Sequence, residues 1–432
     1  MPRLPFSTVL VTSVLLVQGA ALAQPGPDCP APLPVVAQEP TSRRSVPERR
    51  EVFAALTRAI ETRYVYPDYG GLDWPATRRE FAGRLETAPN DQAFWALMKE
   101  LVLRLGDEHS EYLTPEEARL EDAGGSGRVG IGAMIDPDAQ GRRVSRVLPS
   151  GPAERAGVRR GDLLIAVEGD RCMPPEQVQG LPGTTVHMTF RSPDGRERSL
   201  PLVREAAQDR YHPVARRLGQ GGRIGYLELQ TFTGNVADEV QLRLEELLGT
   251  ALNGLIVDLR ANAGGFAPQV RRVLGQFVTG AVARRVGRDG SAQEMVAIDG
   301  ALRDRLEAVP LVLLIDHASA SAAELFAGSL QQRGRARVVG TRSAANTEGV
   351  SAYDLPDGSR LWLADMDLYL LDGRRLGECG VQPDLEVDPD WTRIGSDQDP
   401  VILRAVELLE SPASADGQGR KEAVASSGPG CP

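Results

Sequence analysis

Lysine is the residue that this sequence of 432 residues lacks most. Its only two lysines are Lys99 and Lys421, so nearly all of the 49 basic residues are arginine. Arginine keeps its proton throughout the pH range that proteins meet and therefore cannot act as a general base. Any chemistry that needs a neutral amine has almost no candidate in this chain.

Other shortages exclude further classes of protein. The formal net charge is −10 and no block of Lys or Arg stands out, which argues against a nucleic-acid or anionic-lipid partner. No CxxC or Cys/His spacing occurs, so we expect no metal site, and no motif calls for a cofactor. With 41% hydrophobic and 25% charged residues, the composition is that of an ordinary globular protein of two or three domains.

The N-terminus has the pattern of an export signal. Residues 1–23 contain Arg3, an apolar stretch too short for a stable span, and the small-x-small cleavage pattern Ala21-Leu22-Ala23. We expect a signal peptide over 1–23 and a periplasmic or secreted protein with no membrane span after its removal; an uncleaved anchor is the alternative. The four cysteines would then lie in an oxidising compartment, where they allow three pairings. They are Cys29, Cys172, Cys379 and Cys431.

Two segments have the composition of unfolded chain. Residues 24–47 are rich in proline and predict a linker, and residues 411–432 are rich in small and polar residues and predict a disordered tail. Both ends of the exported chain are therefore expected to lie outside the packed domains.

Three folded regions follow one another between these segments. Residues 48–122 place apolar residues at helical intervals and predict an N-terminal helical region. Residues 123–206 contain short alternating runs broken by Gly and Pro, which predict a small β-rich domain. In residues 207–410, apolar runs alternate with amphipathic helices, which is typical of an α/β core with a mostly parallel sheet under helical cover. We expect one strand of this sheet over 361–371.

The segment DHASASAAELFAGSL, residues 316–330, places Ser319 and Ser321 where a buried strand gives way to a helix. A helix N-terminus supplies unpaired N–H groups and the positive end of a dipole, which stabilise a developing oxyanion. Ser321 is therefore a candidate nucleophile. Ser321 and Glu324 also have the spacing of a capping box, so the local sequence leaves a purely structural role open.

Seven motifs, in this order along the chain, resemble those of the C-terminal processing peptidases, also called tail-specific proteases. They are DW at 73, LGDEHSEYLTPEE at 105, VLPSGPAERAGVRRGDLLIAVEG at 147, GYLELQTF at 225, GLIVDLRANAGG at 254, SASAAELFAGSL at 319 and GVQPD at 380. The resemblance implies a PDZ domain inserted between the helical region and a crotonase-like peptidase core. It also implies a serine endopeptidase that acts on polypeptide substrates, which the PDZ domain recognises by their C-terminal tails.

The resemblance assigns roles to several residues. Ser321 falls on the family's nucleophile, and the oxyanion site falls on Gly264 and Gly265 together with Ala322. Without the resemblance, two glycines after a strand would predict only a tight turn. The peptide-binding loop of the PDZ domain, which holds a C-terminal carboxylate on backbone N–H groups, falls on four consecutive residues. They are Val129, Gly130, Ile131 and Gly132.

The general base of the family is missing from its usual place. Family members place a lysine soon after the strand that follows the nucleophile helix, with a glutamine four residues further on. These positions fall on Asn346 and Val350. Neither side chain can accept the proton of a serine hydroxyl, so the usual Ser/Lys pair is absent.

A histidine is the alternative base. In the tricorn-like and chlamydial-type relatives, a histidine from an Asp-x-His-Ser stretch acts with a glutamate near the final GV.PD motif, which suggests His109 and Glu378 here. His317 precedes Ser321 by four residues and could also reach it, although local backbone hydrogen bonds in its loop are the alternative. His187 and His212 are expected to have a surface or structural role. The remaining alternative is a catalytically inactive, peptide-binding relative that kept the fold and lost the chemistry.

Overall fold

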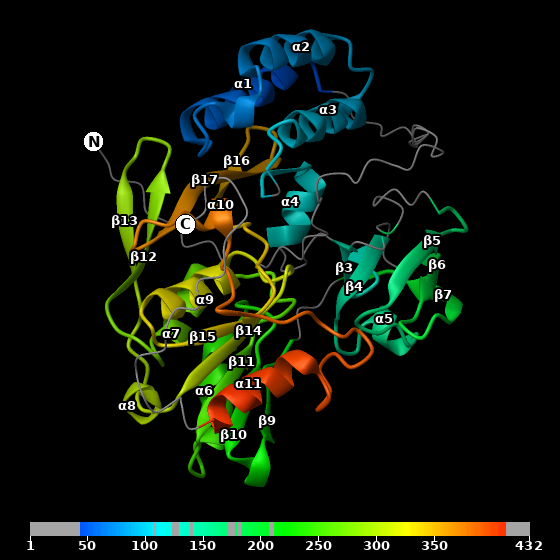
Figure 1. Cartoon of the computed structure of the whole chain (residues 1–432). Helices are drawn as coiled ribbons and strands as arrows, with labels where there is room; N and C mark the ends of the chain where they lie inside the picture. The colour runs from blue at the N-terminus through cyan, green and yellow to red at the C-terminus, as the bar shows by residue number, and fades with distance from the viewer. Residues whose placement is uncertain are drawn as a thin grey trace.

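A computed structural model gives the fold of the protein (Figure 1). The expected signal peptide, most of the expected linker and nearly all of the expected tail lie outside the described residues, although the first helix already includes the last two residues of the predicted linker. Within the described part, no helix is long and apolar enough to cross a membrane. The described residues are 44–107, 109–122, 129–138, 141–171, 178, 183–206 and 211–411.

The N-terminal region is helical, as predicted, and lies at the top of Figure 1. Asp73 and Asn90 begin two of its helices by accepting hydrogen bonds from the N–H groups of Ala76 and Ala93. The apolar faces of the helices bury one common core, which also takes in residues of a sheet described below. The elements are α1 (Val46–Arg63), η1 (Tyr69–Gly71), α2 (Trp74–Glu86), α3 (Asp91–Leu103), β1 (Glu111–Leu113) and α4 (Pro115–Asp122).

The β-rich region forms a domain of its own at the right of Figure 1, with a five-stranded antiparallel sheet in the order β3-β4-β5-β6-β7. Alternate residues of its strands, such as Val186, Met188 and Phe190, are fully buried in its own small core. β3 is an edge strand of this sheet. The elements are β2 (Val129–Gly130), β3 (Ala133–Asp138), β4 (Gly141–Val147), α5 (Pro152–Arg155), β5 (Leu163–Val167), β6 (Thr185–Arg191), β7 (Glu197–Val203) and β8 (Glu205–Ala206).

The core contains a six-stranded sheet in the order β18-β15-β14-β11-β10-β9. All neighbours are parallel except β9 and β10, which confirms the predicted mostly parallel sheet. The strands are β9 (Val214–Leu218), β10 (Ile224–Glu228), β11 (Gly254–Asp258), β14 (Leu311–Ile315), β15 (Arg337–Gly340) and β18 (Leu385–Glu386). The helices are η3 (Gln220–Gly222), α6 (Val236–Leu247), α7 (Ala267–Leu274), α8 (Arg303–Leu306), α9 (Ala322–Gln332), α10 (Leu376–Cys379) and α11 (Pro400–Glu410).

Helices cover both faces of this sheet, which explains why its central strands are apolar throughout. In β14, Leu311 and Leu313 belong to the larger cluster, together with residues of α6, α7 and α9. Val312 and Leu314 point to the opposite face and pack with residues of α11. Because successive side chains of a strand alternate between faces, a strand buried on both sides needs an uninterrupted apolar run.

One predicted strand lies in a different sheet. The segment expected over 361–371 forms β17 (Arg360–Leu370), which is antiparallel to its neighbours β1, β12 and β16. Its prediction as part of the parallel sheet was wrong, because a long buried strand has the same apolar pattern in either kind of sheet. The other strands of this second sheet are β12 (Ala281–Gly287), β13 (Ala292–Val296) and β16 (Gly349–Asp354).

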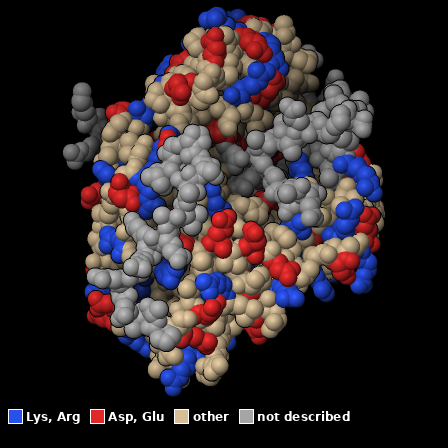
Figure 2. Space-filling view, viewed as in Figure 1, with Lys and Arg blue, Asp and Glu red and all other residues tan. Residues whose placement is uncertain are grey.

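Basic and acidic side chains are interspersed over the face of the molecule seen in Figure 2. Several form exposed ion pairs, such as Arg50 with Glu86 and Arg84 with Glu100. Pairs of this kind add little to stability, because the surrounding water screens the attraction between exposed charges. The fold therefore depends mainly on its buried clusters.

Candidate active site

Two loops meet at the carboxyl ends of adjacent parallel strands. β11 ends at Asp258 and leads into the loop with the glycine pair, and β14 ends at Ile315 and leads into the segment with the two serines. The two strands are hydrogen-bonded neighbours. Since the carboxyl ends of parallel strands lie at the same edge of a sheet, the loops are brought side by side, at the edge where α/β folds place their sites.

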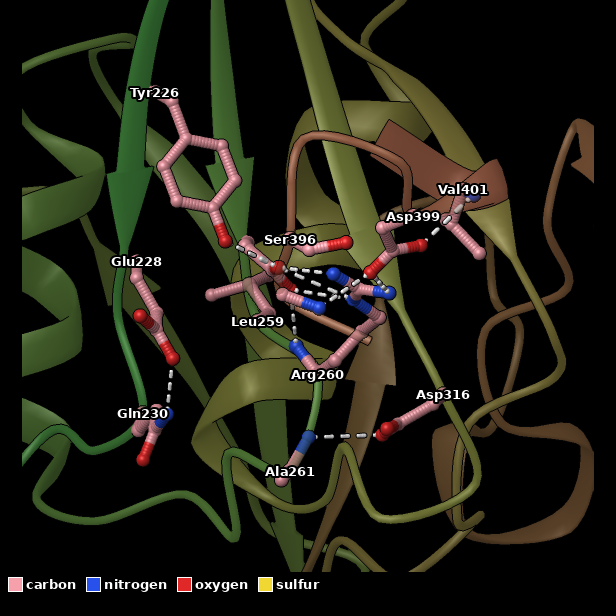
Figure 3. A network of polar contacts seen from close by, with 12 residues as sticks. Tyr226, Glu228, Gln230, Leu259, Arg260, Ala261, Asp316, Ser396, Asp399 and Val401 are labelled. Atoms are coloured by element: carbon pink, nitrogen blue, oxygen red, sulfur yellow. Dashed lines mark hydrogen bonds and ion pairs between the residues drawn. The ribbon is translucent and has the colours of Figure 1, made fainter. Parts of the chain in front are cut away.

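A buried ion network holds the first loop (Figure 3). The guanidinium of Arg260 donates to Asp258 at 2.6 Å and to Asp399 at 2.9 Å, and all three side chains are almost completely buried. The hydroxyl of Tyr226 donates to Asp258 at 2.7 Å. The pKa of Asp258 is lowered although burial would raise it, because Arg260 lies beside it. Asp258 and Arg260 are therefore both charged, and the network fixes the start of the loop.

Asp316 joins the first loop to the second. Its Oδ1 accepts hydrogen bonds from the N–H groups of Ala261 at 2.9 Å and Ala318 at 3.1 Å. Its Oδ2 accepts one from Arg160 of the β-rich domain at 3.1 Å. One carboxylate thus connects both site loops and the neighbouring domain.

Ser319 has a structural role. Its hydroxyl is fully buried and donates to the carbonyl of Leu259 at 2.9 Å, and it accepts from the N–H of Asp316 at 3.0 Å. These bonds hold the second loop against the first. Of the two candidate serines, Ser321 is therefore the one that remains for chemistry.

Ser321 has a strained backbone at the mouth of α9. Its φ of 53° and ψ of −115° lie outside the regions that residues with a side chain normally adopt, and its side chain is partly exposed. Strain of this kind costs about 1–3 kcal/mol and persists only where the surroundings impose it. The backbone thus presents Ser321 at the helix N-terminus, as in the turns that hold nucleophilic serines.

Gly264 allows the glycine loop to approach Ser321 closely. Its φ is 99°, and a Cβ atom there would lie 2.7 Å from Cβ of Ser321 and 2.9 Å from the nitrogen of Ala322. The N–H of Gly264 itself donates to Oδ1 of Asn262 at 2.8 Å. Of the two glycines from which one oxyanion donor is expected, Gly264 therefore already has an acceptor for its N–H group. The described residues supply no acceptor to the N–H groups of Gly265 and Ala322, so these two stay the candidate oxyanion donors.

Glu324 organises the loop on the other side of Ser321. This buried carboxylate accepts hydrogen bonds from the N–H groups of Ser321, Ala345 and Asn346 and from the hydroxyl of Ser343. The first of these bonds is one half of the predicted capping box. Burial raises the pKa of Glu324 to about 7, and the four donors limit that rise. The sequence indicates this role, because an acidic residue in an otherwise apolar, buried helix needs hydrogen-bond donors for its carboxylate.

The position expected for lysine lies against the nucleophile. The carbonyl of Asn346 accepts a hydrogen bond from the N–H of Ser321 at 2.8 Å, and Asn346 is buried. The position expected for glutamine, Val350, lies in β16 opposite Ala364. The loop at the position expected for lysine therefore lies next to Ser321, with an amide side chain at this point.

His109 is held in a fixed turn. Oδ1 of Asp107 accepts from the N–H groups of His109 and Ser110 at 2.9 and 2.5 Å, and the hydroxyl of Ser110 accepts from the N–H of Ala364. The pKa of His109 is lowered, mainly by burial, which outweighs the attraction of nearby carboxylates. The imidazole is therefore neutral at pH 7. No hydrogen bond joins it to Ser321 among the described residues.

Glu378 is not the partner of His109. Its side chain is 60% exposed and pairs with Arg375 at 2.7 Å. The carboxylate that lies beside the imidazole is Glu348, whose Oε2 is 3.5 Å from Nε2 of His109. The prediction of Glu378 was wrong because a spacing along the sequence does not fix which acid faces the histidine.

No hydrogen bond joins the other three histidines to Ser321 among the described residues. His317 is exposed and lies edge-on to Trp391, and His187 and His212 are exposed beside Glu168 and Glu239. His109 is therefore the one imidazole of the described residues that is buried next to the site loops.

The expected peptide-binding loop precedes β3, an edge strand of its sheet. β2, formed by Val129 and Gly130, pairs with β8. The carbonyls of Ile131 and Gly132 accept hydrogen bonds from Ala153 and Leu148, both at 2.8 Å, which hold the loop against its own domain. The edge strand β3 follows at once.

The parallel sheet places a serine with a strained backbone at the N-terminus of a helix, near two backbone N–H groups. This arrangement is typical of a serine hydrolase site. Comparison with known proteins identifies the family. Residues 223–387 match the peptidase family S41, residues 143–191 a PDZ domain and residues 45–102 the tricorn protease C1 domain. The chain belongs to the C-terminal processing serine peptidases of family S41, with a PDZ domain.

Relatives of the same class align over most of the chain. It is 28% identical to the carboxyl-terminal-processing protease of Picosynechococcus sp. over 382 residues, which are 84% of this chain and 89% of that one. It is 27% identical to the chloroplastic carboxyl-terminal-processing peptidase 2 of Arabidopsis thaliana over 403 residues, 88% of this chain and 75% of that one. The solved photosystem II D1 C-terminal processing protease matches with a TM-score of 0.63 and 25% identity, over 85% of this chain and 98% of that one.

Proposed function

We propose that this protein is an exported, active serine endopeptidase in which His109 replaces the family's lysine as general base. The observation that carries the proposal is the strained backbone of Ser321, which lies against Gly264, together with the N–H groups of Gly265 and Ala322, which have no acceptor among the described residues. Strain that serves only a helix cap has no reason to persist, because a cap forms in relaxed backbone. The buried, neutral imidazole of His109 supplies the missing proton acceptor.

The reaction follows the serine peptidase scheme. The oxygen of Ser321 attacks the scissile carbonyl while its proton passes to His109, and the N–H groups of Gly265 and Ala322 stabilise the oxyanion. The imidazolium then donates its proton to the leaving nitrogen, so the C–N bond breaks and an ester remains on Ser321. Water hydrolyses this ester with His109 again as base, which releases the new C-terminal carboxylate.

We assign substrate choice to the PDZ domain. A peptide added to the free edge of β3 would extend the sheet by one strand, and the loop formed by Val129, Gly130, Ile131 and Gly132 precedes that strand, where a C-terminal carboxylate is held in this mode of recognition. The ion pair of Arg160 with Asp316 places the domain against the site loops.

We infer export from the signal pattern at residues 1–23 and from cysteine chemistry. Cys379 is disulfide-bonded, and the other three cysteines lie outside the described residues. Disulfides persist in oxidising compartments, which favours a periplasmic or secreted location.

The test compares the protein and its Ser321→Ala variant on an unfolded protein substrate, with and without a free C-terminal carboxylate. We expect cleavage by the wild type alone, and faster cleavage of the substrate with the free carboxylate. His109→Asn should abolish cleavage, whereas the matched variant His212→Asn, which changes an exposed imidazole, should not.

The alternative is an inactive peptide-binding relative, which Asn346 at the lysine position favours. Equal, negligible cleavage by wild type and Ser321→Ala, with retained binding of C-terminal peptides, would support it. The variant Asn346→Lys helps to distinguish the two functions. If the protein is inactive but its site is otherwise intact, a lysine placed next to Ser321 should give it activity.

A further inference from the structure

We infer that Glu348 is the positioning carboxylate of His109, the role that the sequence suggested for Glu378. Its effect on catalysis depends on the function proposed above; its effect on the imidazole does not. Glu348 lies in the loop that leads into β16, two residues after the position expected for lysine.

The first support is the local geometry. Oε2 of Glu348 lies 3.5 Å from Nε2 of His109, and the side chains are only 12% and 10% exposed. Nε2 is buried and makes no hydrogen bond among the described residues. A movement of less than about 1 Å would bring the two atoms to hydrogen-bond distance. When the ring becomes protonated, its positive charge attracts the neighbouring carboxylate. We therefore expect Nε2 of His109 and Oε2 of Glu348 to form a hydrogen bond in that state.

The second support is the way the carboxylate itself is held. Oε1 of Glu348 accepts a hydrogen bond from the hydroxyl of Tyr66, and Oε2 accepts one from the N–H of Thr347 at 3.2 Å. The guanidinium of Arg375 lies over the ring of Tyr66 and pairs with Asp367. Glu348 is therefore held by Tyr66 and by the backbone of the preceding residue, as a residue that orients another side chain must be.

The third support is the connection to the nucleophile. The carbonyl of Asn346 is bonded to the N–H of Ser321, and Glu348 follows two residues later. Three consecutive residues span at most about 7 Å between their outer Cα atoms. One short segment therefore contacts Ser321 at one end and His109 at the other.

The arrangement sets the tautomer of the imidazole. A carboxylate only accepts hydrogen bonds, so the neutral ring carries its proton on Nε2, the nitrogen beside Glu348. Nδ1 then has the free lone pair and is the nitrogen that can accept a proton. Asp107 and Glu348 both raise the pKa of His109 against the effect of burial. The pKa values of Tyr64 and Tyr66 are raised by burial, so both rings stay neutral and add no charge. Glu348 is thus the nearest charge that stabilises the imidazolium formed when Ser321 gives up its proton.

The experiment is an NMR titration of the imidazoles in the full chain. Only four histidines are present, and His109→Asn assigns the signal. We expect Glu348→Gln to lower the pKa of His109, because an attracting charge is removed, and Glu378→Gln to leave it unchanged. An unchanged titration in Glu348→Gln, or an equal shift in Glu378→Gln, overturns the inference.

Kinetic measurements on the same variants separate this inference from the proposed function. We expect Glu348→Gln to lower kcat by about 10²–10⁴-fold, with Glu378→Gln close to wild type. A wild type no more active than Ser321→Ala would overturn the proposed function, while the titration would still decide the role of Glu348. Should Glu348→Gln not fold, Glu348→Asp retains the charge at a greater distance; it should also lower the pKa of His109, and an unchanged pKa would count against the inference.

Discussion

The two halves of the site differ in how completely their polar groups are satisfied. On the nucleophile side, Asp316 and Glu324 each accept several buried hydrogen bonds from the loops around Ser321, and Arg260 pairs with Asp258 and Asp399 at the start of the glycine loop. On the base side, Nε2 of His109 and the hydroxyl of Thr347 are buried without a hydrogen bond among the described residues. The sequence regions differ as well, since the first half comes from consecutive core loops and the second joins the helical region to the core.

This difference matches what the two halves have to do in the proposed reaction. Amides that stabilise an oxyanion must be in place before the charge forms, because their reorganisation would add to the barrier. A base must exchange a proton, so its environment has to suit two charge states. We therefore expect substitutions on the nucleophile side to destabilise the fold and substitutions on the base side to change the chemistry with little loss of stability.

The largest expected effect is that of Arg260→Met. The variant leaves Asp258 and Asp399 buried without their counter-charge, which should reduce the free energy of unfolding by about 3–5 kcal/mol. Urea denaturation measures it. Arg243→Met, which breaks an exposed pair with Glu246, should cost less than about 1 kcal/mol, and equal losses in both variants would contradict a special role for the buried network.

Gly264→Ala should have the next largest effect, about 1–3 kcal/mol together with loss of cleavage. Its Cβ would lie against Ser321 and the nitrogen of Ala322. Gly280→Ala is the matched control, because Gly280 also has a positive φ, of 75°, but open space around its Cβ position. If the two variants behave alike in thermal unfolding and in cleavage, backbone strain alone explains the loss.

Glu324 should make stability depend on pH. Its pKa is raised to about 7 in the folded protein, so the fold holds its proton more tightly than the unfolded chain does. The contribution of the protonated carboxyl to the free energy of unfolding is present at low pH. It is lost as the pH rises from about 4.5 to about 7, and the total loss is at most roughly 3 kcal/mol. Wild type should therefore gain stability over Glu324→Gln as the pH falls across this interval, measured by urea denaturation, and a constant difference would refute the raised pKa.

His109→Asn should change stability least, by less than about 1 kcal/mol, because Nε2 makes no hydrogen bond that the variant would lose. Cleavage should nevertheless disappear. In the wild type, activity should fall as the pH drops below the pKa of His109, which lies below its usual value, since the protonated ring cannot accept the serine proton. A large loss of stability in this variant would show that the two halves are not distinct.

The sequence predicted the nucleophile half better than the base half. Apolar runs located β11 and β14, and the glycines and serines between them and the next helices indicated which strand ends carry the site. Which amide is free could not be predicted, because the side chain of Asn262 decides it by accepting from Gly264. Periodicity also could not distinguish the sheet to which β17 belongs, since both of its faces are buried.

The base half depends on contacts between distant parts of the chain. Asp107 fixes a turn that the sequence pattern already marked around His109. The acid that faces the ring, however, is selected by how β1 and β16 flank β17. Glu378 had the expected spacing and Glu348 had no signal of its own beyond being two residues from Asn346.

The link from Arg160 to Asp316 has a consequence for how this protein could be re-engineered. Exchanging its PDZ domain for that of a relative would alter more than the choice of tail, since the incoming domain would have to bring a cation to the same carboxylate oxygen. A hybrid without this cation would leave the carboxylate of Asp316, which holds both site loops, without its counter-charge. Specificity and turnover in such hybrids should therefore change together.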